Sequence, residues 1–178
     1  PYRTGGLGMM YPTHTFSGSR TLEFGDLEVE LLEAPGETHD HIVVWIPDDK
    51  TLIAGDNFYW AFPNLYTLRG TSPRAVSSWF ESIDVMRRKP VEHLVPMHTK
   101  PIHGAAEIAE ALTNYRDAMQ WIRDEVVRGA NQGLDLDTLA ETIRLPEHLA
   151  RHHYNREFRG KVDWCVRAIY TNNLGWFD

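Results

Sequence analysis

The most constraining feature of this sequence is a change in its apolar periodicity near residue 72. Before it, short segments rich in β-branched residues alternate apolar and polar positions, as in DLEVELLEA at 26–34. After it, apolar residues recur every three or four positions, as in the run 105–128. The first pattern is typical of strands and the second of amphipathic helices. We therefore expect an α/β protein in which a β-rich half precedes a mainly helical half.

The first half is expected to form one mixed sheet. Four segments have the composition and alternation of strands: 21–24, 26–34, 41–46 and 51–55. Turn residues at 25–26 and 47–49 lie between them, which favours two hairpins. A further segment, 91–98, follows a helical pattern, as a strand that pairs in parallel does.

The second half is expected to be helical apart from that strand. Apolar spacing predicts helices over about 72–89, 105–128, 137–144, 146–157 and 161–172. Ser72 followed by Pro73 is a typical helix start, with a capping side chain before a first-turn proline. The apolar stripe of the 105–128 helix, which includes Tyr115, is interpreted as core.

Composition argues against several kinds of partner. The formal net charge is −7 and the sequence has no run of Lys or Arg, which argues against a nucleic-acid or anionic-membrane surface. No apolar run approaches the roughly 18 residues of a membrane span, and the opening PYRTGGLGMMYP lacks the order of a signal peptide. Cys165 is the single cysteine, so no internal disulfide is expected. The sequence predicts no compartment.

Three candidate metal ligands stand where a predicted strand meets a loop. Glu37 opens the cluster ETHDH, Asp56 follows TLIAG, and His98 follows VPM. Strand ends along one sheet edge converge in space, and carboxylate and imidazole are the usual ligands of zinc. We therefore expect these three side chains to lie close together. The simpler alternative for Asp56 is that the Gly-Asp-Asn at 55–57 is only a turn.

Several motifs together resemble one known family. PGETHDHIVVWIP, LIAGDN, FPNLYTLRG and HTKPIHG resemble the later motifs of the metallo-β-lactamase fold, specifically of the alkylsulfatase branch of zinc hydrolases. LPEHLA and LGWFD resemble the lead-in to the dimerisation region of the same proteins. The resemblance implies half of an αββα sandwich, with a mixed sheet and flanking helices, over 1–132. A helical segment like the start of a dimerisation domain is then expected over 133–178.

The resemblance also assigns roles to particular residues. Glu37 matches a glutamate that replaces the third-motif histidine, Asp56 matches the acid that bridges two zinc ions, and His98 matches the closing histidine. Arg69, together with Asn64 in NLYTLRG, matches the stretch that binds sulfate. A planar guanidinium suits this task because it can hold two sulfate oxygens at once.

Other histidines and acids near these positions have competing interpretations. His39, Asp40 and His41 are expected to lie at the surface or behind the metal ligands, with Asp40 as a hydrogen-bond acceptor or turn former. His103 in PIHG competes with His98 as the closing ligand. Three histidines in a charged helical stretch are expected to face solvent: His148, His152 and His153.

The first metal motif of the superfamily, HxHxDH, does not occur in these 178 residues. Asp40-His41 could end that pattern only if histidines stood at 36 and 38, where the chain has Gly36 and Thr38. Upstream of Glu37 the one histidine is His14. The chain thus resembles the second half of a metallohydrolase, and we expect it to have little or no activity, and weak or no zinc binding, by itself.

The function implied by the resemblance is hydrolysis of alkyl sulfate esters at a dinuclear zinc site. Two alternatives stay open, namely a non-catalytic assembly module and a hydrolase of another ester, lactone or β-lactam. Half of a sandwich leaves a sheet face uncovered, so we expect a homodimer or a separate chain that supplies the missing half. The strand residues expected to meet solvent are Leu27, Val29, Leu31, Val43, Trp45, Leu52 and Ala54.

Overall fold

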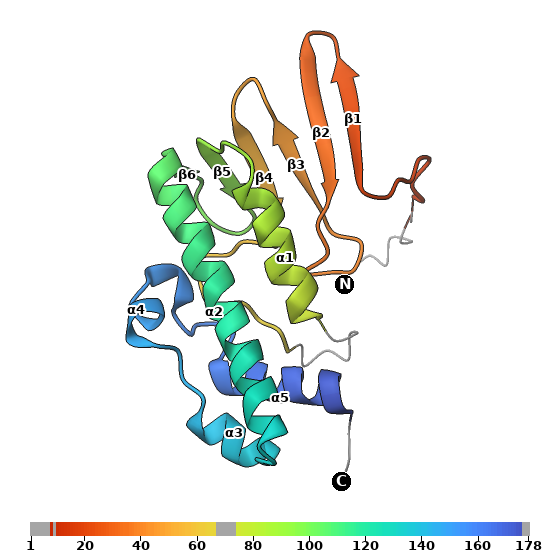
Figure 1. Ribbon diagram of the computed structural model, residues 1–178. Helices are drawn as coiled ribbons and strands as arrows, with labels where there is room; N and C mark the ends of the chain where they lie inside the picture. The colour runs from red at the N-terminus through yellow and green to blue at the C-terminus, as the bar shows by residue number, and fades with distance from the viewer. Residues whose placement is uncertain (1–7, 9, 67–73, 176–178) are drawn as a thin grey trace, which may run out of the picture.

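A computed structural model describes residues 8, 10–66 and 74–175. Its sheet has six strands in the order β1 to β6 (Figure 1). The strands are β1 (Ser19–Phe24), β2 (Leu27–Glu33), β3 (Ile42–Ile46), β4 (Thr51–Gly55), β5 (His93–Pro96) and β6 (Ile102–His103). Only β4 and β5 pair in parallel, and the other neighbours are antiparallel. The expected mixed sheet, its two hairpins and its parallel strand are confirmed.

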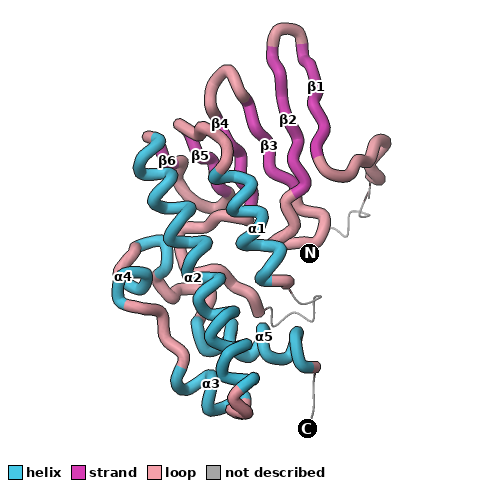
Figure 2. Tube along the Cα trace, in the orientation of Figure 1, coloured by secondary structure: helices cyan, strands magenta, loops and turns pink. Residues whose placement is uncertain are grey.

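The described α-helices come after β4 in the chain, with α1 before β5 and the others after β6, as the periodicity predicted (Figure 2). They are α1 (Val76–Arg87), α2 (Ala105–Asn131), α3 (Leu136–Thr142), α4 (Glu147–Ala150) and α5 (Val162–Leu174), with a 3₁₀ turn at His153–Asn155. The proposed start of the first helix at Ser72-Pro73 lies outside the described residues. Within the described part of the chain, no helix is both long and apolar enough to cross a membrane.

The predicted helix over 146–157 is wrong in its extent, because it breaks after α4. His152 has an extended backbone, with φ −69° and ψ 128°. The buried amide of Asn155 donates hydrogen bonds to the carbonyl groups of Leu149 (3.1 Å) and Asn114 (3.2 Å). These bonds hold a turn where a continuous helix was expected. The short strand β6 was not predicted, since two residues are too few to show an alternation.

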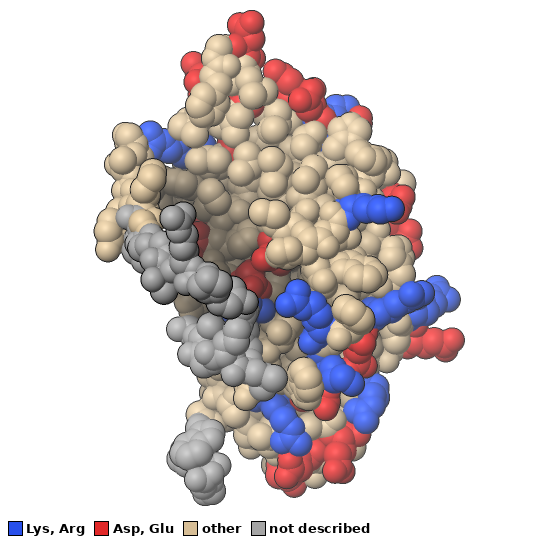
Figure 3. Space-filling view, turned by 180° about the vertical axis from the view of Figure 1, so that it is seen from behind, with Lys and Arg blue, Asp and Glu red and all other residues tan. Residues whose placement is uncertain are grey.

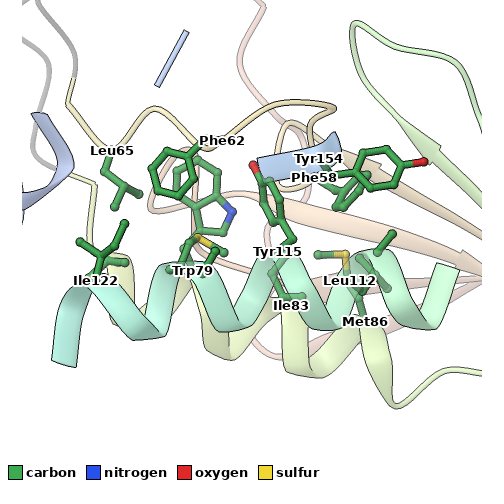
Figure 4. Close-up of a cluster of buried hydrophobic side chains, with 14 of the residues drawn as sticks. Phe58, Phe62, Leu65, Trp79, Ile83, Met86, Leu112, Tyr115, Ile122 and Tyr154 are labelled. Carbon is green, nitrogen blue, oxygen red and sulfur yellow. The ribbon is translucent and has the colours of Figure 1, made fainter. Parts of the chain in front are cut away.

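One face of the sheet packs against α1 and α2, and the main core lies between them (Figure 1). Figure 4 shows part of this core, with Trp79 and Ile83 from α1 near Leu112 and Tyr115 from α2. Helix α5 packs against α2 and α3, and its apolar side chains join the same core cluster. The helical segment after residue 133 is therefore continuous with the core under the sheet.

The expectation about exposed strand residues is partly wrong. Val43, Leu52 and Ala54 are fully buried, and Trp45 is 5% exposed, because these residues point toward the helices. The opposite face carries the exposed apolar side chains, with Leu27 39% exposed. Consecutive residues of a strand point to opposite faces of the sheet. Leu27, Val29 and Leu31 lie on the open face and the buried residues lie on the other, so the prediction that all of them share one exposed face is wrong.

The open face of the sheet has a continuous apolar row. The strand registers place Leu31 beside Val44, Val44 beside Ile53, and Ile53 beside Val95. All four are half-buried or exposed. Figure 3, which views the molecule from behind, shows few charged groups over the centre of this region.

Candidate functional site

A cavity of about 310 Å³ lies where the loops after several strands meet the first residues of the helical half. Figure 3 shows this side of the molecule hollowed, with acidic side chains inside the hollow. The lining residues are Glu37, Asp56, Tyr59, Phe62, Pro63, Asn64, Arg74, Trp79, His98, Tyr115 and Arg159. The three expected metal ligands thus share one cavity with Asn64. Arg69 lies outside the described residues.

Asn57 connects the loop that carries Glu37 to the loop that carries Asp56. Its side chain is fully buried, donates to the carbonyl oxygen of Ala34 (2.6 Å) and accepts from the backbone N–H of Glu37 (3.0 Å). A Cβ atom at Gly36 would lie 2.3 Å from the Asn57 side-chain oxygen, so only glycine fits this approach. Sequence reasoning missed Asn57, because Gly-Asp-Asn was weighed only as a metal ligand or a turn.

Asp56 and His98 approach each other directly. His98 Nε2 lies 3.4 Å from Asp56 Oδ1. That carboxylate oxygen is buried and makes no hydrogen bond to a described residue. His98 has φ +60°, an uncommon conformation for a residue with a side chain, and such strain is often found at functional sites. One carboxylate oxygen and one imidazole nitrogen therefore face each other at the cavity wall.

Glu37 is held by Arg74, which sequence reasoning did not single out. Arg74 Nη2 forms an ion pair with Glu37 Oε1, and Arg74 Nη1 donates a hydrogen bond to the carbonyl oxygen of Asn64. Both charged side chains are mostly buried, which strengthens their attraction. Arg74 therefore ties the loop of Asn64 to the carboxylate of Glu37.

His41 lies behind the cavity lining and beside Asp56. A Cβ atom at Gly55 would be 2.6 Å from His41 Nε2, so the ring covers the left-handed glycine before Asp56. Burial lowers the pKa of His41, and the negative charge of Asp56 opposes this shift. Its Nδ1 atom is buried without a hydrogen-bond partner in the described part of the chain. Burial thus disfavours the charged form of His41, which lies next to a candidate ligand.

The remaining candidates lie apart from the cavity lining. His39 is exposed, and Asp40 accepts a hydrogen bond from Thr38 Oγ1 (2.8 Å) that lowers its pKa. His103 faces His93 across the edge of the sheet, with 2.9 Å between their Nδ1 atoms. The predicted solvent exposure holds for His148 and His153, whereas His152 is half-buried, with Nε2 3.2 Å from Glu110 Oε1.

The residues present fit a metal centre in their chemistry and only partly in their arrangement. Carboxylate and imidazole donors suit zinc and similar ions. Among residues 8, 10–66 and 74–175, no group of three or more such side chains is arranged to hold an ion. Asp56 and His98 offer facing donors, whereas Glu37 is engaged by Arg74. A bound ion would require Glu37 to exchange this partner or another donor to replace it.

Comparison with known proteins agrees with the fold. The model of the metallo-beta-lactamase superfamily matches residues 10–98, and the model of alkyl sulfatase dimerisation matches residues 135–178. A linear primary-alkylsulfatase from Pseudomonas sp. is 40% identical over 168 residues, covering 93% of this chain and 32% of that protein. Alkyl/aryl-sulfatase BDS1 from Saccharomyces cerevisiae is 31% identical over 163 residues, with 89% and 25% coverage.

A solved structure of an alkylsulfatase has the same fold as this chain. The sec-alkylsulfatase Pisa1 from Pseudomonas sp. superposes with a TM-score of 0.87 at 25% identity, over 92% of this chain and 26% of that one. The chain therefore spans about a quarter to a third of the length of these proteins. The superfamily match covers half of the chain, and the chain accordingly belongs to the metallo-beta-lactamase superfamily and joins that domain to an alkyl sulfatase dimerisation region.

Proposed function

We propose that the protein takes part in hydrolysis of alkyl sulfate esters at a dinuclear zinc site to which Glu37, Asp56 and His98 contribute. The observation that carries this proposal is the shared cavity, where these three side chains lie with Asn64 and two arginines. Similarity to proteins named alkylsulfatases supports the choice of ester. The superfamily implies a metal centre in general, and zinc is favoured by the mixture of carboxylate and imidazole.

In this proposal each residue has a task that its surroundings suit. Asp56 and His98 would hold the ions, which supply a water of lowered pKa and polarise the ester. Arg74 fixes the orientation of Glu37 through their ion pair. Asn64 presents a buried side-chain oxygen without a hydrogen-bond partner in the described structure. Arg69 would add a guanidinium for the sulfate group.

The third donor can be identified by metal content. His41 is the competitor of Glu37, because its ring lies against the glycine before Asp56 and its buried Nδ1 has no hydrogen-bond partner in the described structure. Zinc per chain should be measured by mass spectrometry of metal ions in Glu37→Gln, His41→Gln and the control His39→Gln. The proposal expects zinc loss in Glu37→Gln and none in His39→Gln. Loss in His41→Gln alone would transfer the ligand role to His41.

The activity test uses sulfate release from dodecyl sulfate. In the native polypeptide that carries these residues, Asp56→Asn should abolish release, and a chelator should do the same. We also propose that the isolated 178-residue chain is inactive, because three ligands shared between two ions leave each under-coordinated. Chelator-resistant release by the native polypeptide would refute the metal-dependent mechanism. Chelator-sensitive release by the isolated chain would refute only its inactivity.

A non-catalytic assembly role is the second candidate. It is favoured by the ion pair that engages Glu37 and by the lack of a three-donor group among the described residues. In that case metal titration would leave the stability of the protein unchanged. A rise in unfolding temperature with added zinc, lost in Asp56→Asn, would favour the hydrolase instead.

A further inference from the structure

Tyr115 combines a core ring with a hydroxyl group that lines the cavity. The residue lies on α2 and its side chain is fully buried. Figure 4 shows the ring beside Phe58, with the hydroxyl oxygen pointing away from α2. The ring centroids of Tyr115 and Phe58 are 4.9 Å apart. This packing holds the hydroxyl in a fixed position.

The hydroxyl of Tyr115 is buried, and its proton has no acceptor among the described residues. Leaving such a group unpaired costs about 1–3 kcal/mol, so buried hydroxyl groups nearly always have a partner. Burial and the charge of Glu37 raise the pKa of Tyr115, an effect that the nearby backbone N–H of Tyr59 opposes. The phenol therefore keeps its proton and offers a donor to the cavity.

Arg159 brings positive charge to the same cavity from the C-terminal segment. Its guanidinium lies 5.9 Å from the ring centroid of Tyr59, and it forms no ion pair with a described residue. The other described arginine of the cavity, Arg74, is paired with Glu37. Arg159 is exposed at the cavity rim, where a guanidinium can attract and orient an anion.

The backbone on either side of Arg159 packs directly against the cavity wall. The N–H of Phe62 donates to the carbonyl oxygen of Arg156 (2.9 Å). A Cβ atom at Gly160 would lie 2.2 Å from the carbonyl oxygen of Pro63, so the two backbones are in direct contact. These two backbone contacts, at Arg156 and Gly160, flank Arg159 and hold its backbone against the cavity wall.

We propose that Tyr115 and Arg159 form an oxyanion subsite that binds the sulfate group of the ligand. This rests on the proposed function, since the sulfate ester is taken from it. Tyr115 would donate a hydrogen bond to one sulfate oxygen, and Arg159 would bind the charge from the rim. The subsite makes the C-terminal segment, matched to a dimerisation region, part of the binding cavity.

The subsite can be tested by inhibition with inorganic sulfate. Tyr115→Phe and Arg159→Gln should each raise the inhibition constant of sulfate and the KM for dodecyl sulfate by about tenfold, the effect of one hydrogen bond to a charged group. The matched controls are Tyr154→Phe, a tyrosine of the same aromatic cluster, and Arg156→Gln, an exposed arginine of the same segment. Both controls should leave these constants unchanged.

Failure of the subsite and failure of the proposed function give different results. If the native polypeptide hydrolyses dodecyl sulfate but either Tyr115→Phe or Arg159→Gln keeps its sulfate inhibition constant, the subsite is wrong and the function stands. If it hydrolyses no alkyl sulfate, the function is wrong. Sulfate binding can then be measured by calorimetry, where a loss in both variants supports the subsite and an unchanged affinity in either one overturns it.

Discussion

At the scale of single residues, the sequence located the candidate ligands but not the groups that hold them. Glu37, Asp56 and His98 line one cavity because strand ends converge, a rule that needs only the strand order. Arg74 and Arg159 come from loops whose paths depend on tertiary packing, so no local pattern pointed to them. Periodicity assigned Tyr115 to the core, which is right for its ring and uninformative about its hydroxyl.

Asn57 gives the first prediction, since it links the loops of Glu37 and Asp56. Asn57→Ala would leave the carbonyl group of Ala34 and the N–H of Glu37 without their buried partners. We expect a loss of about 2–4 kcal/mol in the free energy of unfolding, measured by urea denaturation. The exposed Asn131→Ala is the control and should be nearly neutral. Equal stability of the two variants would contradict the linking role.

Cys165 gives a prediction about reactivity. It is fully buried, and burial raises the pKa of its thiol to about 12. At pH 8 only about one thiol in ten thousand would be ionised, and the thiolate is the reactive form. Ellman's reagent should therefore leave the folded protein unmodified and titrate one thiol per chain in guanidinium chloride. Complete labelling within minutes under native conditions would show that α5 does not stay packed.

At the scale of secondary structure, the periodic segments were predicted well, whereas the two-residue strand β6 and the break after α4 were not. The 27-residue helix α2 follows directly from its apolar spacing, because many positions agree. Strand β6 and the break after α4 depend on a few hydrogen bonds made by distant residues, among them those of Asn155. Such contacts leave no period in the sequence.

Gly160 gives the prediction at this scale, because it seats the segment between α4 and α5 on the cavity wall. In Gly160→Ala the added Cβ would collide with the backbone at Pro63, which cannot move as a side chain does. We expect a loss of about 1–3 kcal/mol and faster proteolysis near residue 160. Gly8→Ala, whose added Cβ meets nothing within 4 Å, is the control. Resistance to proteolysis equal to the wild type would contradict this packing.

At the scale of the whole molecule, the sheet is covered on one face and open on the other. The open row runs through Leu31, Val44, Ile53 and Val95, and continuous apolar surface of this kind usually marks an interface. A standard interface covers about 800 Å² on each partner, which at 25 cal/mol per Å² amounts to about 20 kcal/mol before entropy costs if that surface is apolar. The segment 135–178, matched by the model of alkyl sulfatase dimerisation, is the second candidate surface for association.

The last prediction separates these two surfaces. Val44→Lys with Ile53→Lys places charges on the open face and should convert an associated form into a 20.5 kDa species in sedimentation velocity. Trp164→Lys places a charge on α5, where the indole is 37% exposed, and tests the helical surface in the same way. The exposed Glu141→Lys on α3 is the control for charge alone. Because the row on the sheet crosses four strands while Trp164→Lys changes a single side chain, the double lysine variant should have the larger effect. A wild-type chain that is a stable monomer at micromolar concentration would contradict the prediction, since the open face would then need no cover.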